Sequence, residues 1–273
     1  MLGASLHRNV FEQRSSQTNL SRSQTLNLSS SWLYCPLFAI PGLTTMKLLA
    51  IETATEACSA ALYIDGEIGL RYEVRPRGHS ELILGMMDIL LAEADLKPGQ
   101  LDAMAFGRGP GSFTGVRIAT GVVQGAAFGA DLPVVPVSTL AALAQRAFRE
   151  QGERHLLPAY DARMQELYWA AYEVDDQGLV QPVQAELVTR VAQVPHPEGG
   201  GWYGVGSGWA AYGEALQSRF GAGVVKGSDP DLLCSAFDVA LLGVAGFERG
   251  EAVMPEAALP IYLRDNVAVK PAT

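Results

Sequence analysis

The chain has 273 residues, of which 48% are hydrophobic and 18% are charged. This is the composition of a globular protein with a sizeable core, and no apolar run approaches the roughly 20 residues of a membrane-spanning helix. The net charge of −9 argues against nonspecific recruitment of nucleic acid, so any RNA contact would need a local patch or a partner. Cys35, Cys58 and Cys234 are odd in number and widely spaced, which argues against a disulfide scaffold and favours a reduced cytoplasm.

Residues 1–45 differ from the rest of the chain. They contain eight serines and three arginines but one acidic residue, Glu12, and no helix or strand period organises them as far as Ser31. This start could be an organelle transit peptide, a secretory signal, or the product of an upstream in-frame start that leaves Met46 as the working start. We expect the last of these, with residues 1–45 an extension that is disordered or not part of the working protein.

The pattern from Met46 onward predicts two α/β lobes, 46–150 and 151–273. Asp65-Gly66 is a strong hairpin signal, and Ser80 and Ser138 are expected to cap helices. The late helix is expected to pack back on the first lobe. The expected strands are 47–51, 58–64, 68–74, 101–106, 133–137, 156–160 and 167–174, and the expected helices are 79–94, 116–129, 139–151, 209–220 and 235–247.

Two of the expected helices have an unusual distribution of side chains: one has too many apolar residues, and the other has a repeat of glycines. The helix 79–94 has eight apolar residues, more than one stripe can hold, so it needs cover on two sides from a partner protein or from its own domain. In the next helix Gly121, Gly125 and Gly129 recur at every fourth position, where each glycine costs roughly 1 kcal/mol relative to alanine. Close approach of another backbone is the usual compensation, so we expect a helix–helix contact there.

Local motifs give weak chemical signals. The glycine-rich loop 107–115 is either a phosphate loop or a tight packing turn, and it lacks the lysine of a GxxxxGK[ST] motif. Asp161 and Glu166 are either an acid–base pair or two solvated carboxylates. The histidines show no metal-ligand spacing, and residues 204–208 lack the GxSxG spacing of a serine hydrolase.

Several motifs together resemble the TsaB family, formerly called YeaZ, over residues 46–273. They are the run MKLLAIETATEACSAAL from Met46, Gly78-His79-Ser80-Glu81, GPGSFTGVR from Gly109, Asp161-Ala162-Arg163 with Glu166 and Tyr168, and Pro260-Ile261-Tyr262-Leu263-Arg264. The resemblance implies the actin-like ATPase fold (ASKHA, ribonuclease H-like), built of two α/β lobes.

The resemblance also implies a role in making N6-threonylcarbamoyladenosine beside the anticodon of tRNA. In that pathway a synthase makes threonylcarbamoyl-adenylate, and the transferase TsaD passes the threonylcarbamoyl group to the adenosine. Members of the TsaB family bind TsaD and are regarded as required but non-catalytic, and the small ATPase TsaE joins the complex. We therefore expect a cytoplasmic scaffold that forms a heterodimer with a TsaD-like protein, forms a homodimer when alone, and meets tRNA only through the complex, with no membrane contact.

A degenerate cleft is expected on the same grounds. Arg163 stands where a phosphate-binding turn would have glycine, and Thr139 and Leu143 stand where TsaD has a histidine pair for metal. We expect no catalytic residue, no metal and no required cofactor, with ATP or ADP bound weakly. The residues of such a vestigial nucleotide cleft would be Glu52, Thr53, Thr55, Gly109, Asp161, Arg163 and Gly206.

The partner interface of the family is formed by the helix after the HSE stretch and the helix after GPGSFTGVR. The residues expected at that interface are Leu82, Met86, Met87, Gly111, Val116, Gly121 and Gly125. The alternative class of function is an enzyme, a nucleotide hydrolase, kinase or acyltransferase, that uses its own actin-like cleft. A peptidase is the third class, and no serine, cysteine or metal constellation in the sequence favours it.

Overall fold

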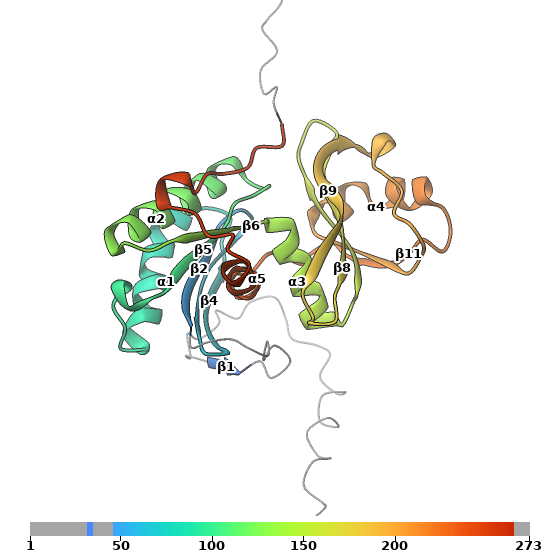
Figure 1. Ribbon diagram of the computed structural model, residues 1–273. Helices are drawn as coiled ribbons and strands as arrows, with labels where there is room; N and C mark the ends of the chain where they lie inside the picture. The colour runs from blue at the N-terminus through green and yellow to red at the C-terminus, as the bar shows by residue number, and fades with distance from the viewer. Residues whose placement is uncertain (1–31, 35–45, 265–273) are drawn as a thin grey trace, which may run out of the picture. The chain divides into compact units, whose positions relative to one another are not determined.

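The computed structural model describes residues 32–34 and 46–264, which form two mixed β-sheets covered by helices (Figure 1). The strands are β1 (Trp32–Tyr34), β2 (Lys47–Glu52), β3 (Ala57–Ile64), β4 (Glu67–Val74), β5 (Ala103–Gly107), β6 (Val134–Val137), β7 (His155–Asp161), β8 (Glu166–Val174), β9 (Val180–Arg190), β10 (Trp202–Val205) and β11 (Val225–Asp229). The helices are α1 (His79–Glu93), α2 (Phe113–Ala130), α3 (Thr139–Gln151), α4 (Ser207–Phe220) and α5 (Ala236–Glu248), with short 3-10 turns at Pro98–Gln100, Val191–Gln193 and Pro255–Ala257.

The two sheets share the same order over five strands, and the first sheet has β1 as an additional strand at its edge. The first sheet runs β1-β4-β3-β2-β5-β6, and the second runs β9-β8-β7-β10-β11. In each sheet an antiparallel meander of three strands is extended by two parallel strands beside the first strand of the meander. This duplicated α/β arrangement confirms the two-lobed actin-like fold that the resemblance implied.

The core follows from the alternation of side chains along the central strand β2. Leu48 and Ala50 pack into a cluster with α5 and α3, whereas Leu49 and Ile51 pack on the opposite face with α1 and α2. Figure 1 shows α1 and α2 on one side of the first sheet and α5 on the other. Almost every residue of α5 is buried, because the helix packs against β2, β3 and β5 and also against α3.

Local sequence patterns predicted most of the helices and several of the strands. The hairpin at Asp65-Gly66 is confirmed, with φ angles of 50° and 97° at the two turn residues. Ser138 caps α3 by accepting the N–H of Ala141 at 3.2 Å, as expected. The predicted cap at Ser80 is wrong, because Gly78 precedes α1 in a left-handed conformation and no side chain caps that helix. Helix α2 starts three residues earlier than expected because Ser112 caps it.

Other elements escaped the sequence analysis. Strands β9, β10 and β11 complete the second sheet, and none of them was predicted. Within the expected extension, β1 pairs with β4 and forms one edge of the first sheet, and residues 1–31 and 35–45 lie outside the described residues. None of the helices in the described part of the chain is both long and apolar enough to cross a membrane.

A buried ion pair fixes α3 to α5 and gives a test of this packing. Arg149 donates to both carboxylate oxygens of Asp238 at 2.9 Å, and the Asp238 side chain has no exposed area. We predict that Arg149→Ala lowers the free energy of unfolding by about 3–5 kcal/mol, because it leaves a buried carboxylate without its partner.

Urea unfolding measures this loss, and Arg249→Ala is the matched control. Arg249 pairs with Glu251, but both side chains are about half exposed. Its removal should therefore lower the free energy of unfolding by at most about 1 kcal/mol. Equal losses in the two variants would contradict the role given to the Arg149–Asp238 pair.

Candidate functional site

The carboxyl group of Glu52 ends β2 in the interior of the protein. Its Oε1 accepts the N–H of Ala54 at 2.5 Å, and its Oε2 accepts from Thr139 Oγ1 at 3.3 Å and from Cys234 Sγ at 3.5 Å. Burial raises the pKa of Glu52, and the hydrogen bonds from Ala54, Cys234 and Thr139 lower it only in part. This carboxyl is therefore held by one local contact, from Ala54, and by two contacts from distant parts of the chain, Thr139 and Cys234.

The glycine-rich loop makes room for the turn that follows Glu52. A Cβ atom at Gly107 would overlap the Glu52 carboxyl group, one at Gly115 would overlap the carbonyl oxygen of Thr53, and one at Gly111 would lie 2.6 Å from the carbonyl oxygen of Ala54. In return, Thr53 Oγ1 donates to the Gly115 carbonyl at 2.7 Å. Loop 107–115 therefore makes the close contacts of a tight packing turn, and phosphate binding by this loop stays a prediction.

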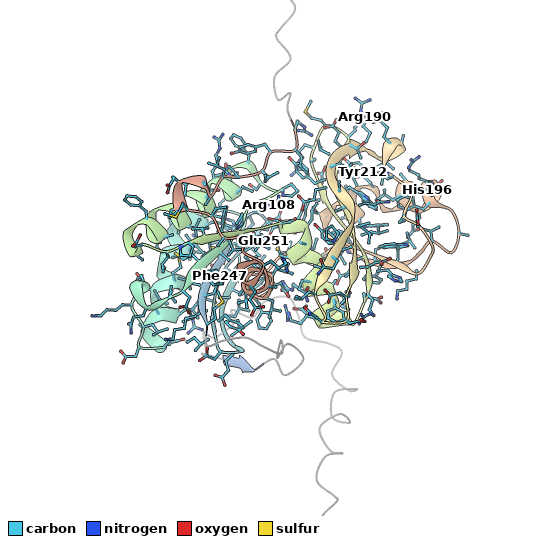
Figure 2. All side chains as sticks on the ribbon, in the orientation of Figure 1. Arg108, Arg190, His196, Tyr212, Phe247 and Glu251 are labelled. Carbon is cyan, nitrogen blue, oxygen red and sulfur yellow. The ribbon has the colours of Figure 1, made fainter. Side chains whose placement is uncertain are left out.

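The second turn of the expected cleft is the β7–β8 hairpin. Asp161 Oδ1 accepts from the backbone N–H of Arg163 at 2.9 Å and from Tyr212 Oη at 3.2 Å, and Oδ2 accepts from the Arg163 guanidinium at 3.1 Å (Figure 2 labels Tyr212). Arg163, Met164 and Gln165 all have φ between 56° and 63°. Three successive non-glycine residues in this region mark a strained turn. Glu166 is bound instead by Arg264 at 2.6 Å, so Asp161 and Glu166 have separate partners.

The other residues of the expected cleft have structural roles. Thr55 Oγ1 accepts the N–H of Ala57 at 3.2 Å within the β2–β3 turn. Gly109 and Gly206 have φ of 92° and 93°, a conformation that favours glycine. A Cβ atom at Gly206 would also lie 2.7 Å from Leu143 Cδ2.

The two positions where the transferase would have metal-binding histidines are occupied here by Thr139 and Leu143. Thr139 is buried against Glu52, and Leu143 belongs to the hydrophobic core. Among residues 32–34 and 46–264, no group of three or more His, Cys, Asp and Glu side chains is arranged to hold a metal ion.

Helices α1 and α2 together present an exposed apolar surface. On α1 the exposed apolar side chains are Leu84 and Ile89, and on α2 the side chain of Phe128 is 77% exposed. Four glycines of these helices are open, because no atom of the described chain lies within 4 Å of a Cβ built on any of them; they are Gly85, Gly121, Gly125 and Gly129. The helix–helix contact expected at the glycine face is thus absent within the described residues. We call Leu84, Gly85, Ile89, Gly121, Gly125 and Phe128 the α1–α2 surface.

The residues expected at the partner interface separate into three groups by exposure. Gly121 and Gly125 lie on the α1–α2 surface, and Leu82 and Gly111 are half-buried. Met86, Met87 and Val116 point into the chain's own core and are between 2% and 7% exposed. Substitutions at these three positions would therefore disturb folding before they could report on a partner.

Comparison with known proteins places the chain in a family. A family model described as "TsaD: tRNA N6-adenosine threonylcarbamoyltransferase" matches residues 63–272. The tRNA threonylcarbamoyladenosine biosynthesis protein TsaB of Escherichia coli K12 is 42% identical over 229 residues, which cover 82% of this chain and 97% of that protein. The chain belongs to the TsaB family. TsaB of Haemophilus influenzae gives the same result: it is 38% identical, and the match covers 82% of this chain and 96% of that protein.

The solved structures give the same result for the fold. YeaZ from Pseudomonas aeruginosa is 46% identical, superposes with a TM-score of 0.74, and covers 80% of this chain and all of that chain. Because the TsaD model also matches, the chain is related to the transferase, yet it has Thr139 and Leu143 where the resemblance places the transferase's histidines.

Two features of the site were beyond the sequence analysis. Cys234 reaches Glu52 across 182 residues of chain, and Arg264 reaches Glu166 across 98. A lone cysteine and a tail arginine carry no local signal for such contacts. The PIYLR motif was the one available hint that the tail has a fixed position.

The buried carboxyl predicts a specific pH dependence of stability. Because the pKa of Glu52 is raised in the folded protein above its ordinary value of 4.5, the folded state holds the proton longer than the unfolded state. The Glu52 contribution therefore becomes less favourable as pH rises from about 4.5 to the folded-state pKa. Glu52→Gln keeps an acceptor for Ala54 and removes this titration, so its stability relative to the parent chain should increase with pH across that window.

Urea unfolding of both proteins at several pH values from about 4 to about 8 measures this difference. Asp161→Asn is the control, because Asp161 lies in the exposed hairpin and shows no such burial. A difference between Glu52→Gln and the parent chain that stays constant with pH would contradict the account.

Proposed function

We propose that this chain is a non-catalytic subunit of the system that forms N6-threonylcarbamoyladenosine in tRNA. It docks a TsaD-like transferase through the α1–α2 surface. The observation that carries this proposal is that surface: α1 and α2 both carry exposed apolar side chains and open glycines, and no part of the described chain packs against those glycines. The pathway is proposed from membership of the TsaB family, whose members are named as tRNA threonylcarbamoyladenosine biosynthesis proteins.

The chemistry of the surface favours a helical partner. An open glycine lets the backbone of another helix approach closely, and Leu84, Ile89 and Phe128 add exposed apolar area on the same two helices. Since this chain matches the TsaD model, a TsaD-like partner would share its fold and could present an equivalent pair of helices. A second copy of the chain could use the same surface, so a homodimer and the heterodimer would compete.

The expected cleft supports the absence of catalysis by this chain. Glu52 is enclosed, Asp161 is bound by Arg163 and Tyr212, and loop 107–115 is filled by the turn after β2. Each group that could act on a phosphate thus already has a partner within the chain. We therefore propose no required cofactor, with at most weak binding of ATP or ADP.

The remaining partners follow from the complex. A net charge of −9 suits a subunit that supports an RNA-binding partner, so tRNA would be contacted through the transferase. A TsaE-like ATPase would join through the same assembly. Such a complex would work in the cytoplasm, where tRNA is modified.

A docking variant tests this proposal directly. In Gly125→Arg the new Cβ atom has open space around it, and replacing a helix glycine removes a destabilising residue, so folding should be retained. The bulky cation should block both assemblies. Size-exclusion chromatography with light scattering should show a homodimer for the parent chain, a heterodimer after addition of the transferase from the same organism, and a monomer for Gly125→Arg in both conditions.

The matched control is Ala215→Arg, which places the same side chain on an exposed position of α4, beside the other sheet. It should behave like the parent chain. Persistence of both the homodimer and the heterodimer in Gly125→Arg, with normal thermal unfolding, would exclude the α1–α2 surface as the docking site.

A further inference from the structure

The C-terminal segment 258–264 crosses from the first lobe to the second. It begins beside α2, where Gln124 Nε2 donates to the Ala258 carbonyl at 3.0 Å. It then reaches the glycine-rich loop, where the N–H of Ile261 donates to the Arg108 carbonyl at 2.9 Å. The motif PIYLR lies in this segment, and the docking proposal uses none of it.

An aromatic and cationic cluster holds the segment to the start of α2. The guanidinium carbon of Arg117 lies 3.7 Å from the ring centroid of Phe113 and 5.6 Å from that of Tyr262. Its Nε also donates to Tyr262 Oη at 2.8 Å. The three side chains are exposed, so the cluster is a surface contact that can form and break without disturbing the core.

The other end of the segment is bound to the second lobe. Arg264 Nη2 donates to the Ala162 carbonyl at 2.9 Å and to Glu166 Oε2 at 2.6 Å. The Arg264 and Glu166 side chains are only 18% and 29% exposed, which favours a stronger pair than one in full solvent. Both acceptors belong to the β7–β8 hairpin, whose turn contains the three residues with positive φ.

A second link runs beside the first. Arg108, whose carbonyl accepts the N–H of Ile261, also pairs through its guanidinium with Glu186 of β9 at 3.2 Å (Figure 2 labels Arg108). Glu186 accepts in turn from Tyr172 Oη on β8 at 3.1 Å. Arg108 and the segment thus join the same loop of the first lobe to the same meander of the second.

We propose that residues 258–264 act as a strap that couples the β7–β8 hairpin to the start of α2. Release of Arg264 at one end loosens Ile261 and the Phe113–Arg117–Tyr262 cluster at the other. The apolar core around α3 and α5 holds the lobes together in either state, whereas the strap contacts are polar and partly exposed. Only the identification of α2 as a docking helix rests on the proposed function.

Amide hydrogen exchange of the full chain, followed residue by residue by NMR, tests the strap without any partner. The reporters are the N–H of Ile261, which binds Arg108, and the N–H of Glu166, which binds the Arg163 carbonyl at 3.0 Å. In Arg264→Ala both amides should exchange about tenfold faster or more, while Ala50 in β2 should be unchanged. Tyr262→Ala, at the opposite end, should accelerate Glu166 as well.

The control is Arg190→Ala. Arg190 lies opposite Glu166 in the β8–β9 register and is exposed, so the variant removes a neighbouring positive charge without touching the tail (Figure 2). It should leave both reporters unchanged. Faster exchange at Glu166 alone in Arg264→Ala would overturn the proposal, because the ends would then be independent. An equal acceleration at Ala50 would also overturn it, because the effect would be a general loss of stability.

Transferase binding provides a separate measurement. If the strap positions α2 for docking, Arg264→Ala should weaken the heterodimer about tenfold, although Arg264 lies outside the α1–α2 surface. If Arg264→Ala exchanges faster at both Ile261 and Glu166 but binds the transferase with unchanged affinity, the strap has a structural role only, and its link to docking is overturned. A parent chain that fails to bind the transferase would instead contradict the proposed function, with the exchange result still standing.

Discussion

The enclosure of the Glu52 carboxyl is the constraint on which the organisation of this cleft depends. A carboxyl group at the end of the central strand must be either solvated or supplied with donors, and here Ala54, Thr139 and Cys234 supply them. The glycine at 107 is needed because any side chain there would occupy the same space. The turn after Glu52 then lies against Gly111 and Gly115. The Glu52 carboxyl and the turn after it are thus packed against other parts of the chain at the end of the central strand β2.

The outer face of the first sheet is covered by α1 and α2, which pack on β3 and β5. Helices α1 and α2 complete their own core through Ile83, Met86, Met87 and Val123, and they also carry exposed apolar side chains and open glycines. We propose that this surface, and not the cleft, carries the function of the chain. The strap adds a connection between these regions, since it joins the hairpin of Asp161 to the start of α2.

The sequence was informative where the determining interactions are local. Asp65-Gly66 and Ser138 act on residues within four positions, so the hairpin and the cap were predicted correctly. Ser80 failed as a cap because the left-handed conformation of Gly78 decides where α1 begins. Strand β11 was missed because its residues, VKGSD, are polar and only partly buried, so they show no strand pattern. The resemblance located Glu52, but its partner Cys234 depends on the tertiary fold. The surface on α2 was recognisable from its glycine repeat, whereas the buried positions of Met86 and Met87 were not, because the helix is apolar on more than one side.

The most direct test of the central claim is a reconstituted assay of N6-threonylcarbamoyladenosine formation in tRNA. It would compare the parent chain with a double variant, Glu52→Gln and Asp161→Asn, which alters both carboxyl groups of the expected cleft and leaves the α1–α2 surface intact. The account predicts that the double variant binds the transferase and supports the same rate of modification, within about twofold. A loss of about a hundredfold or more with the complex still assembled is the size expected when an acid or base catalyst is removed. That result would show that the cleft of this chain performs chemistry.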